Sequence, residues 1–113
     1  MTQYVVRAGL VRPRTLIAGT TFHRDIPALS GFSVQSAPGL SVEELVRGGR
    51  FPHTWIGVTD LETFLLLGFN LVFPTPGKGA YHTTVRRPYP LSPDAAALLS
   101  SMFVRRRNRY RGI

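Results

Sequence analysis

Three polar residues in this sequence carry side chains that can do chemistry, and each lies in or beside a short apolar run. Arg7 ends the run YVVR, Ser33 lies in GFSVQS, and His82 lies in the β-branched run YHTTV. A planar guanidinium binds two phosphate oxygens at once, and an imidazole exchanges a proton near neutral pH. Each residue alone is typical of a surface or structural position, but together they form a candidate site.

The chain offers little support for other kinds of site. His23, His53 and His82 lack the paired spacing of metal ligands, and there is no cysteine for a thiolate site, a disulfide or thiol catalysis. At least three of the six carboxylates lie where helices are expected to begin, which argues against a catalytic carboxylate pair. The sequence contains no nucleophile elbow, P-loop or dinucleotide-binding glycine motif.

The charge of the chain favours an anionic partner. Fourteen Lys and Arg against six Asp and Glu give a formal net charge of +8. Nucleic acid, a phosphate-bearing cofactor and an acidic protein all match this sign. Five arginines lie in the last nine residues. We therefore expect one folded domain over residues 1–104 and a basic C-terminal tail over 105–113, through which nucleic acid binding is an option.

The length and hydropathy of the chain predict a single soluble domain. A chain of 113 residues can bury one modest core. No apolar stretch approaches the roughly 18 residues that a membrane helix needs. The start, MTQYVVRAGL, lacks the apolar core and cleavage site of a signal peptide. We expect a chain that acts where it is made or is the processed end of a larger protein.

Apolar periodicity and turn residues predict the elements that position the candidate site. Short strands are expected at 3–9, 31–36, 54–58, 70–73 and 80–86, the last two antiparallel, with a long loop at 10–30. Helices are expected in LSVEELVRGG (40–49), TDLETFLLLG (59–68) and LSPDAAALLSSMF (91–103). Their expected caps are Ser41 with Glu44, Thr59 with Glu62, and Ser92. This order predicts a small α+β domain with a mixed sheet and about three short helices.

Several blocks of the sequence resemble one family. YVVRAG, SGFSVQSAPGLSVEELVRGG, GVTDLETFLLLGFNLVFPTPGKGAYHTTV and PLSPDAAALLSSMF follow one another over residues 4 to about 108. In this order they resemble the C-terminal toxin domains of bacterial Rhs-type polymorphic toxins, specifically the TreTu-like ADP-ribosyltransferase toxins. The resemblance implies an ADP-ribosyltransferase fold and a mono-ADP-ribosyltransferase that uses NAD as co-substrate.

The same resemblance implies partners and a place of action. The expected substrate is a bacterial protein, with elongation factor Tu as the suggested target, so that translation is inhibited. The expected protein is a secreted or delivered effector of interbacterial competition that acts in the cytoplasm of the target cell. A toxin of this kind needs an immunity protein, and the charge of this chain predicts an acidic one.

The resemblance also implies residue roles. Arg7 is expected to hold a phosphate or the nicotinamide ribose of NAD, and Ser33 to brace the nicotinamide pocket. His82 is expected to orient the ribose in place of the glutamate that the family usually carries, which GAYHTTV lacks; a carboxylate from Asp60 or Glu62 is the alternative. The implied cofactor-binding residues are Arg7, Gly31, Phe32, Ser33, Tyr81 and Thr84, with Phe22 as a further aromatic candidate for stacking on the nicotinamide ring.

Two other functions are compatible with the same residues. A metal-independent ribonuclease would use His82 as general base with Thr84, Lys78 and Arg86 at the reacting phosphate, and would hold RNA through the basic tail. A non-catalytic module would bind nucleic acid through the tail alone. The ribonuclease predicts RNA cleavage without NAD, the module predicts salt-sensitive binding without turnover, and the transferase predicts labelling of a protein from NAD.

Overall fold

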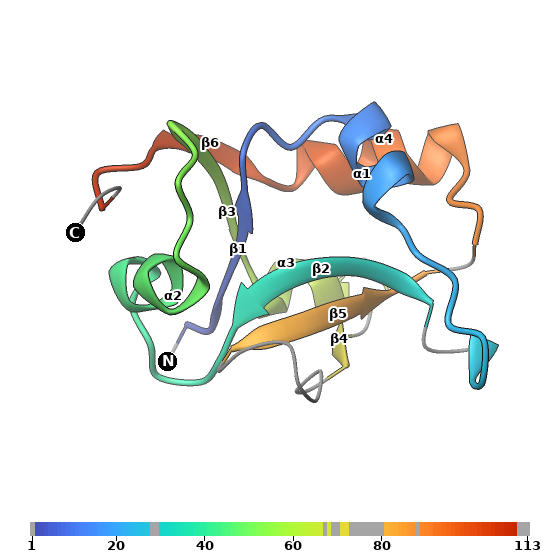
Figure 1. Ribbon diagram of the computed structural model, residues 1–113, viewed down its shortest axis with the longest axis horizontal. Helices are drawn as coiled ribbons and strands as arrows, with labels where there is room; N and C mark the ends of the chain where they lie inside the picture. Colours follow the sequence, from blue (N-terminus) through green and yellow to red (C-terminus); the bar gives the residue numbers. More distant parts are fainter. Residues whose placement is uncertain are drawn as a thin grey trace.

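The computed structural model of the chain describes residues 2–27, 30–66, 68, 71–72, 81–87 and 89–110. These residues form an α+β domain in which helices cover both faces of an antiparallel sheet (Figure 1). This is the class that the sequence predicts. Within the described part of the chain, no helix is long and apolar enough to cross a membrane.

The described residues contain six strands. They are β1 (Tyr4–Ala8), β2 (Gly31–Ser36), β3 (Trp55–Asp60), β4 (Leu71–Val72), β5 (His82–Arg86) and β6 (Val104–Arg107). Their order across the sheet is β4-β5-β2-β1-β3-β6, and each neighbouring pair is antiparallel. The predicted antiparallel pairing of the strands near 70–73 and 80–86 is confirmed by β4 and β5.

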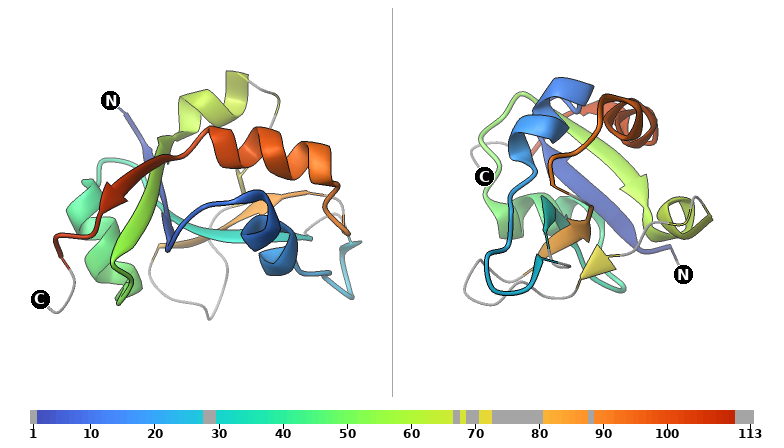
Figure 2. Two further views of the ribbon diagram at one scale, coloured as in Figure 1. Left: turned by 90° about the horizontal axis from the view of Figure 1, so that it is seen from above. Right: turned by 90° about the vertical axis from the view of Figure 1, so that its right-hand side faces the viewer.

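The sheet opens between its two central strands. β1 pairs with β3 along its whole length, but it pairs with β2 only through Val5 opposite Ser36 and Val6 opposite Gln35. Beyond Val6 the two strands separate, and β2 and β5 run crosswise to β1 and β3 (Figures 1 and 2). The sheet therefore has two halves, β4-β5-β2 and β1-β3-β6, that are joined near the start of β1.

Four helices are described, and two of them begin at the caps that the sequence predicts. They are α1 (Pro13–Gly19), α2 (Val42–Gly49), α3 (Leu61–Leu66) and α4 (Pro93–Ser101). At α2 the Ser41 hydroxyl accepts a hydrogen bond from the Glu44 N–H, and the Glu44 carboxylate accepts one from the Ser41 N–H, both at 3.1 Å. At α4 the Ser92 hydroxyl accepts from the Ala95 N–H at 3.2 Å. These bonds satisfy N–H groups that a helix start leaves unpaired.

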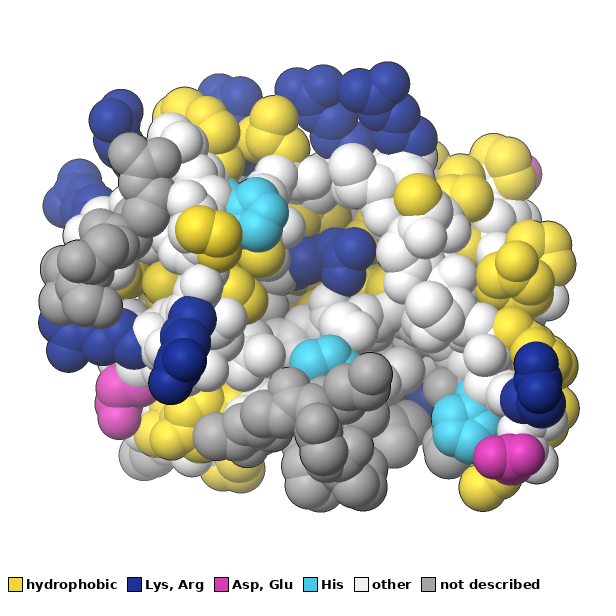
Figure 3. All heavy atoms as spheres, viewed as in Figure 1, with side chains coloured by type: hydrophobic (Ala, Val, Ile, Leu, Met, Phe, Trp, Pro, Cys, Tyr) yellow, Lys and Arg dark blue, Asp and Glu magenta, His cyan; other side chains and the backbone are white. Residues whose placement is uncertain are grey.

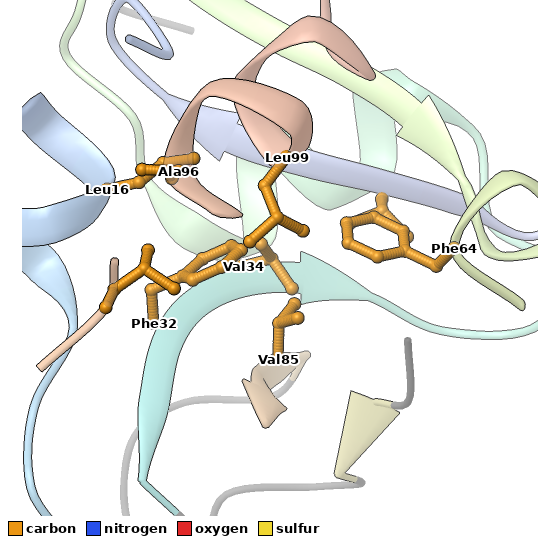
Figure 4. Close-up of a cluster of buried hydrophobic side chains, with 9 residues drawn as sticks. Leu16, Phe32, Val34, Phe64, Val85, Ala96 and Leu99 are labelled. Atoms are coloured by element: carbon orange, nitrogen blue, oxygen red, sulfur yellow. The ribbon is translucent and has the colours of Figure 1, made fainter. Parts of the chain in front are cut away.

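Two apolar clusters lie on opposite sides of the sheet. One lies under α1, α3 and α4 and includes Phe32 and Val34 of β2 (Figure 4). The other lies under α2 and includes Val6, Ile56 and Val58. β1 contributes Val5 to the first cluster and Val6 to the second, because successive strand residues face opposite sides of a sheet.

The predicted loop over 10–30 is wrong in its first half, where α1 lies. Arg12 occupies the N-cap position and Pro13 follows as the first helical residue. The helix is held by tertiary packing, because Leu16 is fully buried in the core cluster next to α4. A helix this short has little intrinsic stability, and Arg12 is not one of the usual capping residues, so Pro13 at the first helical position was only a weak local signal of it.

The predicted basic tail is also wrong at its start, because Arg105, Arg106 and Arg107 belong to β6. This strand pairs with β3 from Val58 opposite Val104 to Trp55 opposite Arg107. Beyond it, the buried Asn108 side chain donates hydrogen bonds to the carbonyl oxygens of Phe51 and His53 at 3.0 and 2.9 Å. All four residues of β6 are exposed, so the strand is held by main-chain pairing and shows no apolar alternation in the sequence.

The start of α3 differs from its predicted capping box. Thr59 lies inside β3, opposite Val5. Asp60 caps the helix instead, since its carboxylate accepts hydrogen bonds from the N–H and the hydroxyl of Thr63 at 2.8 and 2.9 Å. Pairing with β1 extends β3 to Asp60 and so moves the helix start along the chain.

A β-carbon at Gly31 would overlap the main-chain carbonyl group of Val85 on the neighbouring strand. Backbone cannot move aside without breaking the β2–β5 ladder, so we expect Gly31→Ala to lower the free energy of unfolding by about 1–3 kcal/mol. Urea denaturation measures this. The matched control is Gly19→Ala, whose β-carbon would meet the end of a long side chain. Equal stability of the Gly31→Ala protein and the wild type would contradict the prediction.

Candidate functional site

Arg7 lies where β1 and β2 separate, and its side chain spans the gap. Its Nη1 donates a hydrogen bond to the carbonyl oxygen of Ser33 at 2.5 Å. Its guanidinium carbon lies 5.4 Å from the centre of the Phe32 ring, within the range of a cation–π contact. The end of α1 approaches from a third side, because a β-carbon at Gly19 would lie 2.5 Å from Nη2. One guanidinium therefore connects β1 to β2 and to α1.

The electrostatic setting of Arg7 favours an anion. Burial lowers the pKa of Arg7 from its ordinary value, because a charged group loses hydration. The single ion pair in the described part of the chain joins Arg47 to Glu43 on α2, so no carboxylate there neutralises Arg7. The Arg7 side chain is half-buried, and a cation held only by a carbonyl dipole and a ring face is incompletely compensated. An anionic ligand would supply the missing charge.

The residues beside Arg7 come from one face of β2 and β5. Ser33 pairs with Thr84, and Gln35 pairs with His82. Directly opposed residues of antiparallel strands point to the same side, so these four share one face of the sheet. The other face carries Phe32, Val34, Thr83 and Val85, all of which are buried. Strand alternation thus separates a polar face from the core face.

A cavity of about 350 Å³ lies over the polar face and the opening between the strands. It is lined by Arg7, Ala8, Ser33, Val34, Gln35, Gly49, Phe51 and His82. The structure thus brings together Arg7, Ser33 and His82, the three residues singled out in the sequence. We call this the first cavity.

A second cavity of about 350 Å³ adjoins the first and shares Arg7 and Ala8 with it. Its further lining is Gly9, Leu10, Arg12, Arg14, Thr15 and His53. The space-filling view shows this face hollowed near its centre, with a basic side chain in the hollow, one histidine to its upper left and another below it (Figure 3). Arg7 thus lies between a lobe whose other polar side chains are Ser33, Gln35 and His82 and a lobe rich in arginine.

Two aromatic residues expected to stack on a ligand ring are placed elsewhere. Phe32 is fully buried in the core and contacts Arg7 from below, so its ring has no face open to a ligand. Tyr81 packs against the cluster under α2, where its ring would touch a β-carbon at Gly48. Phe32 precedes Ser33 by one position on β2, so alternation along the strand turns its ring to the core face. Tyr81 lies just before β5, and its ring packs toward α2.

Three other expected ligand contacts also lie outside the first cavity. Gly31 takes part in the close approach to Val85 described above and does not line the cavity. Phe22 is exposed, with its ring centre 5.9 Å from that of Tyr89. Thr84 shares the face of His82 but is absent from the lining.

No carboxylate occupies the place in the site where the resemblance in the sequence leads us to expect a glutamate. All six Asp and Glu residues lie within the described part of the chain, and none lines either cavity. Asp60 caps α3, and Glu62 lies in the first turn of that helix. The sequence-based alternative that Asp60 or Glu62 supplies the charge is therefore wrong. Of the residues expected in a ribonuclease site, Arg86 lines neither cavity, and Lys78 lies outside the described residues.

Several cavity residues were missed in the sequence. Gln35 had a usable signal, because it follows Ser33 by two positions on a strand and so shares its face. Its side chain is 7 % exposed, and its Oε1 has no hydrogen-bond partner among the described residues. His53 had no such signal, since only the pairing of β1 with β3 brings it to the second cavity. Arg12 and Arg14 follow Arg7 by only five and seven positions, but the start of α1 that places them was not predicted.

Replacing Arg7 by a neutral side chain of similar length tests whether it serves binding or stability. Since the half-buried guanidinium has no carboxylate partner in the described part of the chain, we expect Arg7→Met to change the free energy of unfolding by less than about 1 kcal/mol, or to raise it. Pyrophosphate should raise the melting temperature of the wild type more than that of the variant, because the variant keeps Arg12 and Arg14 but lacks the guanidinium between the two cavities. A large loss of stability in Arg7→Met would show that Arg7 is structural.

Gly19→Ala tests the position of the guanidinium while leaving Arg7 in the chain. The new β-carbon would lie 2.5 Å from Nη2 and would displace the end of the side chain. Alanine also suits a helix better than glycine, by up to about 1 kcal/mol, so we expect a stable protein. The stabilisation by pyrophosphate should shrink, as measured by thermal denaturation. Wild-type stabilisation by pyrophosphate would mean that the guanidinium position does not determine binding.

The comparisons with known proteins add no relative. No family model matches the chain, and neither the curated proteins nor the solved structures include a match. The two cavities and the residues that line them are therefore the features of this chain that indicate a function.

Proposed function

We propose that this protein is a mono-ADP-ribosyltransferase that takes NAD as co-substrate and modifies a bacterial protein, with elongation factor Tu as the first target to test. The observation that supports it is the pair of cavities meeting at Arg7. NAD has a positively charged, amide-bearing pyridinium ring and a ribose at one end, and a negatively charged diphosphate in its middle. A lobe with neutral polar groups beside a lobe with arginines complements these two parts.

The residues divide between the two parts of NAD. The nicotinamide and its ribose would occupy the first cavity, where Ser33, Gln35 and His82 offer hydrogen-bonding groups beside the Phe51 ring. The diphosphate would lie toward the second cavity, near Arg12 and Arg14. Arg7 would contact the ligand between the two, because its guanidinium borders both.

The reaction breaks the bond between the ribose C1′ and the nicotinamide nitrogen. Nicotinamide leaves with the bonding electrons, a nucleophile of the target forms the new bond to C1′, and the proton of that nucleophile passes to a base or to water. Positive charge develops on the ribose as the bond breaks. Because no carboxylate lines the first cavity, the contribution of the protein is to hold the ribose by hydrogen bonds and to exclude water.

In this mechanism His82 is a positioning group for the ribose. A neutral imidazole can accept a hydrogen bond from a ribose hydroxyl, but it does not supply the fixed negative charge of a glutamate. We therefore expect transfer that depends on the geometry of the bound ribose more than on a charged catalyst.

A ribonuclease is the second candidate, and one observation favours it. His82 and His53 line the two cavities that meet at Arg7, so the site offers two imidazoles and a cation. Such a set can act on a phosphodiester, with one histidine as base, the other as acid and the guanidinium on the phosphate. This arrangement differs from the set expected in the sequence, which used Lys78 and Arg86.

Incubation with labelled NAD and a bacterial lysate distinguishes the two functions. We expect label in a protein band of the size of elongation factor Tu and in the purified factor. His82→Ala should lower the rate on the order of tenfold to a hundredfold, because the ribose is held less well. His23→Ala is the matched control, since His23 lines neither cavity and its Nδ1 accepts a local hydrogen bond from the Ile26 N–H. Degradation of purified RNA without NAD, lost in both His82→Ala and His53→Ala, would establish the ribonuclease instead.

A further inference from the structure

β6 forms one end of the sheet in the described part of the chain, and its outer edge carries main-chain groups that no other strand there uses. Asn108 donates its N–H to the carbonyl of Thr54 at 2.8 Å, on the side of β3. Antiparallel pairing alternates along a strand, so Arg106 and Val104 also direct their main-chain groups to β3. The main-chain groups of Arg105 and Arg107 therefore point to the open edge.

The side chains of β6 place positive charge on both sides of this edge. Arg105 and Arg107 lie opposite Gly57 and Trp55, and the Arg105 guanidinium carbon lies 4.9 Å from the centre of the Trp55 ring. Arg106 lies opposite Ile56 and therefore faces the side of α2. In the described residues none of these arginines forms an ion pair.

A third cavity lies against this edge on the α2 side. Its volume is about 330 Å³, and its lining is Val42, Ile56, Arg106, Arg107, Arg109 and Tyr110. Two apolar side chains and three arginines thus line the same hollow. The neighbouring carboxylate of Glu43 is paired with Arg47 at 2.7 Å.

We propose that the outer edge of β6 and the third cavity bind an extended, acidic segment of a partner polypeptide. The segment would add a strand beside β6, with carboxylates facing the arginines and an apolar side chain in the third cavity. Repulsion between the arginines disfavours pairing of β6 with a second copy of this chain, whereas the same charges attract an acidic strand. This proposal is independent of the reaction at the two cavities near Arg7.

The geometry favours a polypeptide over nucleic acid. The open edge presents N–H donors and carbonyl acceptors in alternation, and a peptide main chain satisfies both kinds. Phosphate groups only accept hydrogen bonds, so they would leave the carbonyl groups of Arg105 and Arg107 to water. The apolar residues of the third cavity also suit a side chain better than a phosphate.

Fluorescence anisotropy with labelled probes tests the proposal. The probes are a short peptide of alternating Glu and Val, the matching peptide of Lys and Val, and a short oligouridine. We expect the acidic peptide to bind the wild-type protein and Arg107→Glu to weaken it on the order of tenfold. Arg24→Glu, the same charge change at an exposed residue outside all three cavities, should weaken it less than about twofold, because salt screens distant charges.

A second pair of variants tests the main-chain contact. Arg107→Ala and Arg107→Pro both remove the charge, but only proline removes the N–H that points to the open edge, and edge strands tolerate it. We expect the proline variant to bind the acidic peptide several-fold more weakly than the alanine variant, with both folded by circular dichroism. Equal binding by these two variants, equal losses in Arg107→Glu and Arg24→Glu, or preferential binding of oligouridine would each overturn the proposal.

Discussion

The separation of β1 and β2 beyond Val6 is the constraint that creates the two cavities and places the Arg7 guanidinium between them. A hydrogen bond to a charged group contributes about 1.5–3 kcal/mol, and a cation–π contact about 0.5–2 kcal/mol. Arg7 is half-buried, so its guanidinium loses part of its hydration. The contacts with Ser33 and Phe32 offset that cost, but neither brings a negative charge to the cation. The surrounding fold holds the cation in place, and its unmet charge is available to a ligand.

Close approaches around the cavities explain where glycine and unusual backbone occur. A β-carbon at Gly49 would lie 2.5 Å from the Phe51 ring, which folds back over the end of α2 and lines the first cavity. The left-handed residue that ends the helix is then Arg50, with φ of 53°. A non-glycine residue in this conformation costs roughly 1–2 kcal/mol. The left-handed conformation of Arg50 thus lowers the stability of the fold beside the cavity, and such backbone strain is common at binding sites.

Charge is distributed unevenly over the molecule. The Glu44 carboxylate accepts a hydrogen bond at the start of α2, and the Asp60 carboxylate caps α3. The Glu43 carboxylate is paired with Arg47. The arginines at the two central cavities and along β6 have no such partners in the described part of the chain. The protein therefore presents two separate anion-attracting regions. One is a hollow of molecular size beside polar side chains, and the other is an open strand edge, so the two differ in the ligands they suit.

Local sequence patterns by themselves determined most of the elements. The caps at Ser41 and Ser92 specify α2 and α4, and the run GFSVQS coincides with β2, because capping and alternation act between residues a few positions apart. Alternation along β2 also places the side chains of Ser33 and Phe32 on opposite faces of the sheet. The sequence predicted Arg7, Ser33 and His82 as one candidate set, but it did not determine how close their side chains lie.

Only the tertiary structure decided which of these side chains share a cavity and what surrounds them. α1 and β6 had weak local signals, since one is stabilised by packing on α4 and the other by pairing with β3. His53 comes to the second cavity from a distant part of the chain, and Phe32 and Tyr81 turn away from the first cavity. These outcomes follow from contacts between residues far apart in the sequence. The free energy of such contacts cannot be read from a short stretch of sequence.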